Sequence, residues 1–331
     1  MGKRALITGC CGFIGGQLLR SLVRAGWSVE GVDDTSLGDL ESIFDIGIRP
    51  VPADFLHIYD NQLDGDIREG TLVINGDFAH EAVLRRVKSK KYDVVFHLAA
   101  DPRVPKTIEF PVETYETNVF KTIALFDACR ENVDRVVFAS SAAVYGNTER
   151  LPIRESQVPF PQSPYALQKL QCEQYAELSN KLYNTDIISL RLFNVFGPGQ
   201  KGDSPYSNVI SSWCNNIIEG KSLRVDGCGN QTRDFCYIDN VVDVLRMTAG
   251  FEGTFGSKIL NVGSGVCISN NRILGQLRER HPEITIEKAP ARRGDVKHSQ
   301  ADITEINREL NYNPRVHFHE GLEQTLKWWG L

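Results

Sequence analysis

Short β-branched runs alternate with longer amphipathic runs through the first 195 residues, and this alternation constrains the fold most. The strand-like runs are Arg4–Thr8, Ser28–Val32, Thr71–Asn75, Asp93–Leu98, Arg135–Ala139 and Asp186–Phe193. The helix-like runs are Gly12–Ala25, His80–Lys90, Val112–Glu131 and Pro164–Tyr183. Strands that alternate with helices form parallel sheets with right-handed crossovers. The sequence therefore predicts an α/β fold built on a doubly wound parallel sheet.

The regular alternation ends at the glycine- and proline-rich loop that starts at Gly197. We expect one domain over residues 1–194 and a smaller α/β lobe over residues 195–331. A helix over Val241–Gly250 and a strand over Lys258–Val262 are expected to return to the large sheet, so that about residues 235–263 rejoin the first domain.

Composition excludes several classes of protein. The 331 residues carry a net charge of −5, which gives no basic surface for nucleic acid or an anionic membrane. No apolar run reaches the length of a membrane-spanning helix, and the N-terminus does not resemble a signal peptide. Eight cysteines without CxxC spacing, and dispersed histidines, fit free thiols and no metal site. We expect a cytoplasmic protein without nucleic-acid or membrane partners.

Three glycines follow the first strand and open the first helix. Gly9, Gly12 and Gly15 permit a tight turn and close approach of the backbone to a pyrophosphate, whose charge the helix N-terminus favours. Asp33, 18 residues past Gly15, ends the second strand, where its carboxylate can accept hydrogen bonds from an adenosine ribose. No Arg or Lys follows at 34–36 to pair a 2′-phosphate. The pattern predicts a Rossmann-type site for NAD rather than NADP.

Tyr165 and Lys169 share one face of the predicted helix Pro164–Tyr183. A tyrosine has a pKa of about 10, and a nearby ammonium lowers it towards the range of a general base. Upstream, a strand ends at Ser140-Ser141, and ligands bind at such carboxyl ends of parallel strands. Tyr145 is a rival base, although its place before a glycine at the strand exit favours packing. The arrangement predicts a tyrosine base assisted by a lysine and a serine.

Together these motifs resemble the extended short-chain dehydrogenase/reductase superfamily. Further stretches are similar to its UDP-sugar 4-epimerases: His97–Ala100, Leu192–Pro198, Gly229–Asp239 and Gly294–Asp302. The likeness spans almost the whole chain and is strongest to the branch that acts on N-acetylated UDP-hexoses. It implies an NAD-dependent 4-epimerase that interconverts UDP-GlcNAc and UDP-GalNAc, and possible activity on UDP-Glc and UDP-Gal. It also implies a homodimer formed through helices of the large domain.

The resemblance implies residue roles as well. Tyr165 would remove the C4 hydroxyl proton while hydride passes to NAD, and the 4-keto sugar would turn over before hydride returns. Ser141 would orient the hydroxyl, and Lys169 would hold the nicotinamide ribose. Besides Gly9, Gly12, Gly15, Asp33, Tyr165 and Lys169, the cofactor site would include Phe13, Ile14, Asp77, Phe78, Leu98, Ala99, Ala100 and Thr117. The substrate site would include Arg103, Ser141, Asn194, Val209, Arg233, Arg292 and Ser299.

Local departures leave alternatives open. Dehydratases and decarboxylases of this superfamily carry an acidic residue just after the strand-end serine, where this chain has Ala142 and Ala143. Arg103 stands where epimerases of the N-acetylhexosamine branch often have serine. Its guanidinium would suit a uronic acid carboxylate, which suggests a UDP-uronate 4-epimerase or decarboxylase, or it points to solvent. Ser299 is either the small wall of an N-acetyl pocket or an exposed serine before a helix. A non-enzymatic NAD-binding regulatory protein is the remaining alternative.

Overall fold

The computed structural model describes residues 3–57, 71–203, 208–291 and 296–331. Its contacts divide the chain into two compact units. The first unit comprises residues 1–140, 163–190 and 242–259, and the second comprises residues 141–162, 191–241 and 260–331. Residues 242–259 therefore rejoin the first unit, and the segment 141–162 clusters with the second. We describe each unit by itself.

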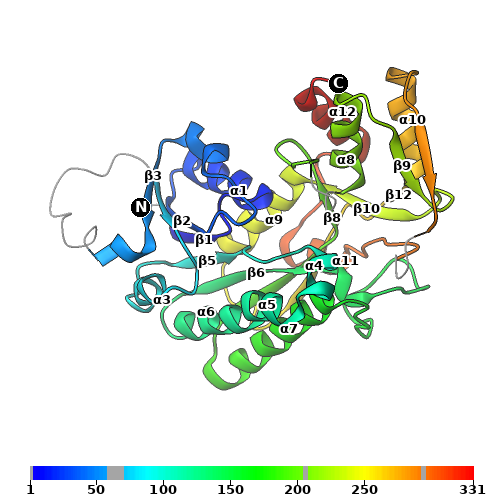
Figure 1. Ribbon diagram of the computed structural model, residues 1–331. Helices are drawn as coiled ribbons and strands as arrows, with labels where there is room; N and C mark the ends of the chain where they lie inside the picture. Colours follow the sequence, from blue (N-terminus) through cyan, green and yellow to red (C-terminus); the bar gives the residue numbers. More distant parts are fainter. Residues whose placement is uncertain (1–2, 58–70, 204–207, 292–295) are drawn as a thin grey trace. The chain divides into compact units, whose positions relative to one another are not determined.

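An eight-stranded sheet organises the first unit, in the order β11-β7-β6-β5-β1-β2-β4-β3 (Figure 1). Its strands are β1 (Arg4–Thr8), β2 (Ser28–Asp33), β3 (Ile48–Pro52), β4 (Thr71–Asn75), β5 (Val94–His97), β6 (Arg135–Ser141), β7 (Ile187–Leu192) and β11 (Ile259–Val262). All pairings from β3 to β6 run parallel. The strand order reverses at β1, so the carboxyl ends of β1, β2, β5 and β6 share the edge where such sheets bind ligands. The predicted doubly wound parallel sheet is confirmed.

Helices cover both faces of this sheet. On one face lie α3 (Glu81–Lys88), α6 (Lys121–Cys129) and α7 (Pro164–Tyr183), with α6 against both of the others. On the other face lie α1 (Phe13–Arg24) and α9 (Ile238–Gly250). The Arg246 guanidinium of α9 donates to the Ser21 hydroxyl of α1 at 3.3 Å. Smaller elements are the 3-10 helices η1 (Leu40–Ile46) and η2 (Ala53–Phe55) and the helix α4 (Val104–Glu109).

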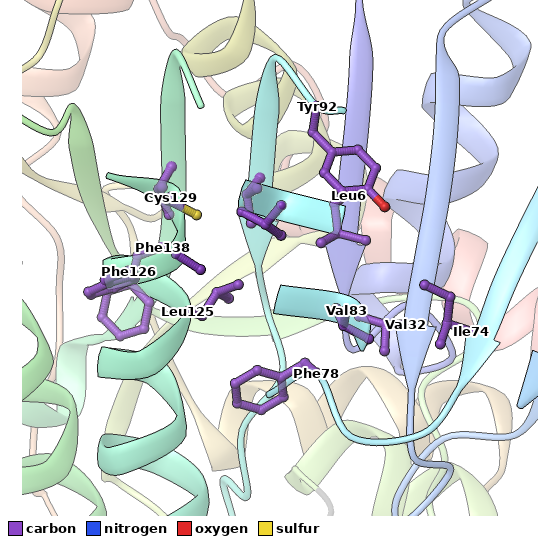
Figure 2. Close-up of a cluster of buried hydrophobic side chains, with 14 of the residues drawn as sticks. Leu6, Val32, Ile74, Phe78, Val83, Tyr92, Leu125, Phe126, Cys129 and Phe138 are labelled. Carbon is purple, nitrogen blue, oxygen red and sulfur yellow. The ribbon is translucent and has the colours of Figure 1, made fainter. Parts of the chain in front are cut away.

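The hydrophobic core of the first unit lies between the sheet and α3, α6 and α7. Figure 2 shows side chains from β1, β2, β4 and β6 meeting Val83, Leu125 and Phe126 of the helices. Phe126 and Phe138 pack edge to face, with ring centroids 5.5 Å apart. This apolar contact sets the helices at a fixed distance from the strand ends.

A fully buried histidine connects this core to the strand ends. Thr122 donates its hydroxyl proton to the Asn118 carbonyl, so it must accept from His97 Nε2–H at 2.8 Å. The other ring nitrogen, Nδ1, then accepts from the Thr8 hydroxyl at 2.7 Å, and Thr8 in turn accepts from the Ala99 N–H. Burial lowers the pKa of His97 well below its usual value. His97 is therefore neutral, with both ring nitrogens satisfied.

The second unit holds two small sheets. One has the order β12-β10-β8, from β8 (Asn194–Phe196), β10 (Thr232–Tyr237) and β12 (Cys267–Ser269), and the other pairs β9 (Leu223–Asp226) with β13 (Ile286–Ala289). The helices are η4 (Ala142–Tyr145), α8 (Val209–Ile218), α10 (Asn270–Arg280), α11 (Thr304–Leu310) and α12 (Phe318–Trp329). Phe196, Phe235 and Phe318 pack against one another at its centre.

The helix expected over Val112–Glu131 is present, but it is not α-helical throughout. The segment divides into α5 (Pro111–Tyr115), a π-helical turn η3 (Glu116–Phe120) and α6. In η3, the Asn118 side chain accepts from the Asp101 N–H at 2.7 Å and donates to the Asp101 carbonyl and to Gln168. These buried contacts are available because the widened turn places Asn118 towards the interior, and such turns are frequent at functional sites.

Among the residues that the structure describes, no helix has both the length and the apolar character needed to cross a membrane.

Stability should fall in acid because of His97. Its pKa is lowered in the folded state, so below about pH 6.5 the unfolded chain binds a proton that the folded chain does not. We expect the free energy of unfolding to decrease below that pH by up to about 1.4 kcal/mol per pH unit. Urea unfolding across pH 5–8 measures this slope. His97→Gln should flatten it, whereas the same change at the exposed His57 should not; an unchanged slope in His97→Gln would contradict the assignment.

Candidate functional site

The glycine turn after β1 is shaped by close backbone contacts. Gly9 has φ +73°, and a Cβ there would lie 2.8 Å from the Ala99 nitrogen. A Cβ on Gly15 would lie 2.0 Å from the Gly9 carbonyl oxygen. Gly12 is the N-cap of α1, whose 12 residues start at Phe13. A side chain at Gly9 or Gly15 would therefore break the turn that leads into the α1 N-terminus, whose N–H groups and dipole suit a phosphate.

Asp33 ends β2 beside this turn and is 9% exposed. Its Oδ2 accepts from the Cys11 N–H at 2.9 Å, and its Oδ1 accepts from the Thr35 N–H at 2.8 Å. Burial raises the pKa of Asp33, and the two N–H donors oppose that rise. A carboxylate has about four acceptor sites, so two bonds leave it able to accept from ribose hydroxyls. The fit to an adenosine ribose holds.

The other predicted cofactor residues lie in the same unit. Leu98, Ala99 and Ala100 follow β5, where Ala99 approaches Gly9. Phe13 and Ile14 start α1, and Phe78 packs on the His97 ring with centroids 4.9 Å apart. Asp77 forms an ion pair of 2.5 Å with Lys121 of α6, a partner that sequence reasoning missed. Thr117 lies in η3, where its hydroxyl donates to the Glu113 carbonyl at 3.4 Å.

Tyr165 and Lys169 start α7, which Ser163 caps by accepting from the Ala166 N–H. Lys169 is 3% exposed; its Nζ donates to the Ala139 carbonyl at 2.7 Å and lies 4.7 Å from the Phe138 ring centroid. The same Nζ lies 5.9 Å from the Tyr165 ring centroid. Burial lowers the pKa of Lys169 to about 8, against a smaller opposing effect of Cys172 and Glu173. The structure thus brings the predicted tyrosine and a buried cation together.

The two strand-end serines have different environments. Ser140 is buried and donates to Glu173 Oε1 at 2.5 Å, which commits its hydroxyl to the interior. Ser141 is partly exposed, and its Oγ accepts from the Ala143 N–H at 3.2 Å. Among the residues that the structure describes, the Ser141 hydroxyl donates no hydrogen bond. Sequence reasoning missed Glu173, which the i, i+4 spacing from Lys169 on α7 could have indicated.

Tyr145 is held in the interior of the second unit. It is 2% exposed, its hydroxyl donates to Asn261 Oδ1 at 2.6 Å, and its ring packs against Phe193. The Arg191 guanidinium lies 4.6 Å from the centre of the same ring. These contacts agree with the packing role that the sequence favours for Tyr145.

The predicted substrate residues of the second unit lie on several elements. Asn194 starts β8 and pairs with Phe235, Val209 starts α8, and Arg233 lies on β10. Arg292 lies outside the described residues. Ser299 is 8% exposed, and its N–H donates to the Thr232 carbonyl at 3.1 Å. The interpretation of Ser299 as an exposed serine is therefore wrong.

Arg103 is the N-cap residue of α4, in the first unit, and does not simply point to solvent. Its Nε donates to Asp101 Oδ1 at 2.8 Å and its Nη2 to Asp101 Oδ2 at 2.5 Å. Lys106 adds a second cation to Asp101 at 3.1 Å. The guanidinium, only 25% exposed, is therefore already paired with a carboxylate of its own chain. Sequence reasoning missed this pairing, although Asp101 lies only two residues away.

Comparison with known proteins identifies the relatives of this arrangement. The family model for the NAD-dependent epimerase/dehydratase family matches residues 5–263. A UDP-glucose 4-epimerase of Mycolicibacterium smegmatis is 30% identical, with 98% of this chain and 97% of the relative covered.

Solved structures agree. A UDP-N-acetylglucosamine 4-epimerase of Methanobrevibacter ruminantium in complex with UDP-N-acetylmuramic acid is 32% identical, with a TM-score of 0.86 over 99% of this chain and 98% of that one. MoeE5 in complex with UDP-glucuronic acid and NAD is 31% identical, with a TM-score of 0.81 over 98% of each chain. The expectation that NAD is the cofactor is confirmed. This chain belongs to the NAD-dependent epimerase/dehydratase family.

Proposed function

We propose that the chain is a UDP-sugar 4-epimerase that interconverts UDP-GlcNAc and UDP-GalNAc. The observation that carries the proposal is the buried ammonium of Lys169, 5.9 Å from the Tyr165 ring centre, on a chain whose family uses NAD. A buried cation beside the tyrosine ring stabilises a phenolate more than an exposed cation would, because the local dielectric is low. A protein that only binds NAD has no need of such a pair, which disfavours the regulatory alternative.

The chain's own groups have distinct roles. Bound NAD supplies a reversible hydride acceptor. Tyr165 takes the proton of the substrate C4 hydroxyl at its phenolic oxygen and later returns it. Lys169 stabilises the negative charge on that oxygen and binds the nicotinamide ribose. Ser141 orients the C4 hydroxyl. The cofactor pyrophosphate binds at Gly9, Gly12, Phe13, Ile14 and Gly15, and its adenosine ribose binds at Asp33. The rest of the cofactor contacts Asp77, Phe78, Leu98–Ala100 and Thr117.

Residues beside the strand-end serine favour epimerisation over elimination. Dehydration or decarboxylation needs an acid or base next to the reacting carbons, and Ala142 and Ala143 supply neither. Ala142 and Ala143 form the start of η4. Epimerisation needs only the Tyr165 proton transfer and the hydride exchange, so the groups present suffice for it.

The choice of an N-acetylated sugar rests on Ser299. It is small and buried, as a residue that walls an acetamido pocket should be. Asn194, Val209, Arg233 and Arg292 complete the proposed substrate set, the two arginines for the diphosphate. The UDP-uronate alternative depends on Arg103, and it is supported by the similarity to MoeE5, whose structure contains UDP-glucuronic acid. We rank the uronate alternative second because Asp101 already forms two hydrogen bonds with the Arg103 guanidinium. A substrate carboxylate would have to compete with Asp101 for that guanidinium.

We further propose that the protein is a homodimer. Large apolar side chains are exposed on α4–α7 of the first unit: Ile108 is 62% exposed, Val112 83%, Phe120 61% and Leu182 60%. Clusters of this kind on adjacent helices mark protein–protein contacts, and a self-complementary face forms a two-fold dimer.

Tyr165→Phe tests the base directly. It should lower turnover by about 10²–10⁴-fold, since a positioned acid–base group contributes that much, while NAD still binds. Turnover is followed on UDP-GlcNAc, and NAD binding by fluorescence. The control is Tyr145→Phe, which removes the hydroxyl of the rival tyrosine and should keep most of the rate. If the two variants exchange these effects, the assignment is wrong.

The rate should decline above about pH 8 because Lys169 then loses its proton. Since burial lowers its pKa to about 8, the ammonium that stabilises the phenolate is present below that pH and is lost above it. We expect turnover to fall by up to about tenfold per pH unit on the alkaline side. Lys169→Gln should be slow at every pH and lack this decline. An alkaline decline that persists unchanged in Lys169→Gln must come from another group.

Ser299→Tyr should remove activity on UDP-GlcNAc and spare activity on UDP-Glc. The tyrosine ring fills the room that an acetamido group needs, whereas a plain hydroxyl is smaller. The ratio of kcat/KM values for the two substrates measures the effect. Ser299→Ala, which keeps the space, should leave the ratio close to that of the unmodified protein. Equal losses on both substrates, or no activity on UDP-GlcNAc at the outset, would favour the uronate alternative.

A further inference from the structure

We propose that Cys10, Cys11 and Asp33 form a binding site for a thiophilic divalent cation, Zn²⁺ or Cd²⁺, and that this cation excludes NAD. The thiol and carboxylate ligand atoms of the three residues all lie within 4.8 Å of one another. The exclusion of NAD rests on the proposed role of Asp33 as the ribose acceptor. The cation site itself stands on geometry alone.

Folding creates this cluster from residues that sequence spacing does not connect. β1 and β2 pair in parallel, with Thr8 opposite Val32. The pairing extends one residue past β1, because the Gly9 N–H donates to the Val32 carbonyl at 2.8 Å. The next residues therefore run beside Asp33, and the Cys11 N–H bonds its Oδ2 at 2.9 Å. Two adjacent cysteines, without the CxxC spacing of zinc sites, thus acquire a third ligand 22 positions away.

The separation of the two sulfurs matches a shared metal ion. Cys10 Sγ and Cys11 Sγ are 3.9 Å apart. Two thiolates at about 2.3 Å from a tetrahedral Zn²⁺ lie about 3.8 Å from each other. Asp33 would supply an oxygen as the third ligand and water the fourth, which is a common zinc arrangement. The sulfur pair selects thiophilic ions over Mg²⁺ or Ca²⁺, which prefer oxygen ligands.

The surroundings hold the ligands in place. Cys10 is fully buried and Cys11 is 4% exposed. A Cβ on Gly31 would lie 2.5 Å from Cys10 Sγ, and one on Gly38 would lie 2.7 Å from Cys11 Cβ, so both side chains fill spaces that glycines leave. Binding releases the two thiol protons to solvent. Two thiolates, a carboxylate and Zn²⁺ sum to a charge of −1, which the adjacent N-terminus of α1 favours.

Occupancy by a cation and by NAD should be mutually exclusive. The glycine turn that holds the cysteines also leads the chain to the pyrophosphate site, and Asp33 would serve both ligands with the same oxygens. An inhibitory cation of this kind acts on the NAD-free protein, and bound NAD protects against it.

Cobalt binding to the full-length protein tests the proposal without any assay of turnover. NAD-free protein titrated with Co²⁺ should develop thiolate-to-cobalt charge-transfer absorption, and Zn²⁺ should displace the cobalt. Cys10→Ala and Cys11→Ala should each lose the band and weaken Zn²⁺ binding by at least about 10-fold. The control is Cys228→Ala, which removes an exposed cysteine of the second unit and should change nothing. Thermal unfolding checks that each variant is folded.

The outcomes separate this proposal from the proposed function. Loss of the band in both variants, together with its suppression by saturating NAD, supports the site. A band that survives in folded Cys10→Ala and Cys11→Ala, that disappears only in Cys228→Ala, or that persists unchanged with NAD bound overturns it. Absence of epimerase activity would leave the cobalt result unaffected, because that measurement needs only the chain and the metal.

Discussion

The close approach of the Gly9 turn to the end of β5 is the constraint on which the first unit's site depends. A Cβ at Gly9 would meet the Ala99 backbone, so the three residues after β5 can lie beside the turn only if position 9 is glycine. The same turn donates to the Val32 carbonyl and places the Cys11 N–H on Asp33. One backbone contact thus sets the positions of the α1 N-terminus, Asp33 and the carboxyl end of β5 together.

A network of hydrogen bonds connects the Gly9 turn to α7. It starts at the Ala99 N–H, passes through Thr8, His97 and Thr122, and reaches the Asn118 carbonyl. The Asn118 side chain then donates to Gln168, which stands between Tyr165 and Lys169 on α7. Apart from Ala99, the residues of this network are buried, so breaking one of their bonds leaves a polar group unsatisfied at a cost of about 1–3 kcal/mol. The network therefore favours a single arrangement of α7 relative to the strand ends.

Much of this unit could be predicted from the sequence because its signals are local. Periodicity located β1, β4 and α7 at their observed bounds, and the glycine spacing located the turn. What could not be predicted depends on contacts between distant segments. The π-helical turn at Asn118 contacts Asp101 and Gln168, and the short strand β3 pairs along the edge of β4. The pairing of Arg103 with Asp101 is local, but no periodic pattern indicates it. Roles of the substrate residues came from family likeness rather than from any local pattern, and they stay predictions.

Burying Lys169 is costly, and that cost explains the groups around it. An ammonium removed from water loses its solvation, which is why its pKa falls to about 8. The Ala139 carbonyl accepts one of its protons, the Phe138 ring offers its electron-rich face, and the Glu173 carboxylate adds a favourable charge. Glu173 is itself buried, and its carboxylate accepts a hydrogen bond from the Ser140 hydroxyl. A charged pair assembled only for stability would be outperformed by apolar side chains of similar volume. We propose that the ammonium is kept because a phenolate at Tyr165 would need a cation that water does not screen. Cys172 and Glu173 oppose the fall in the pKa of Lys169 that its burial causes.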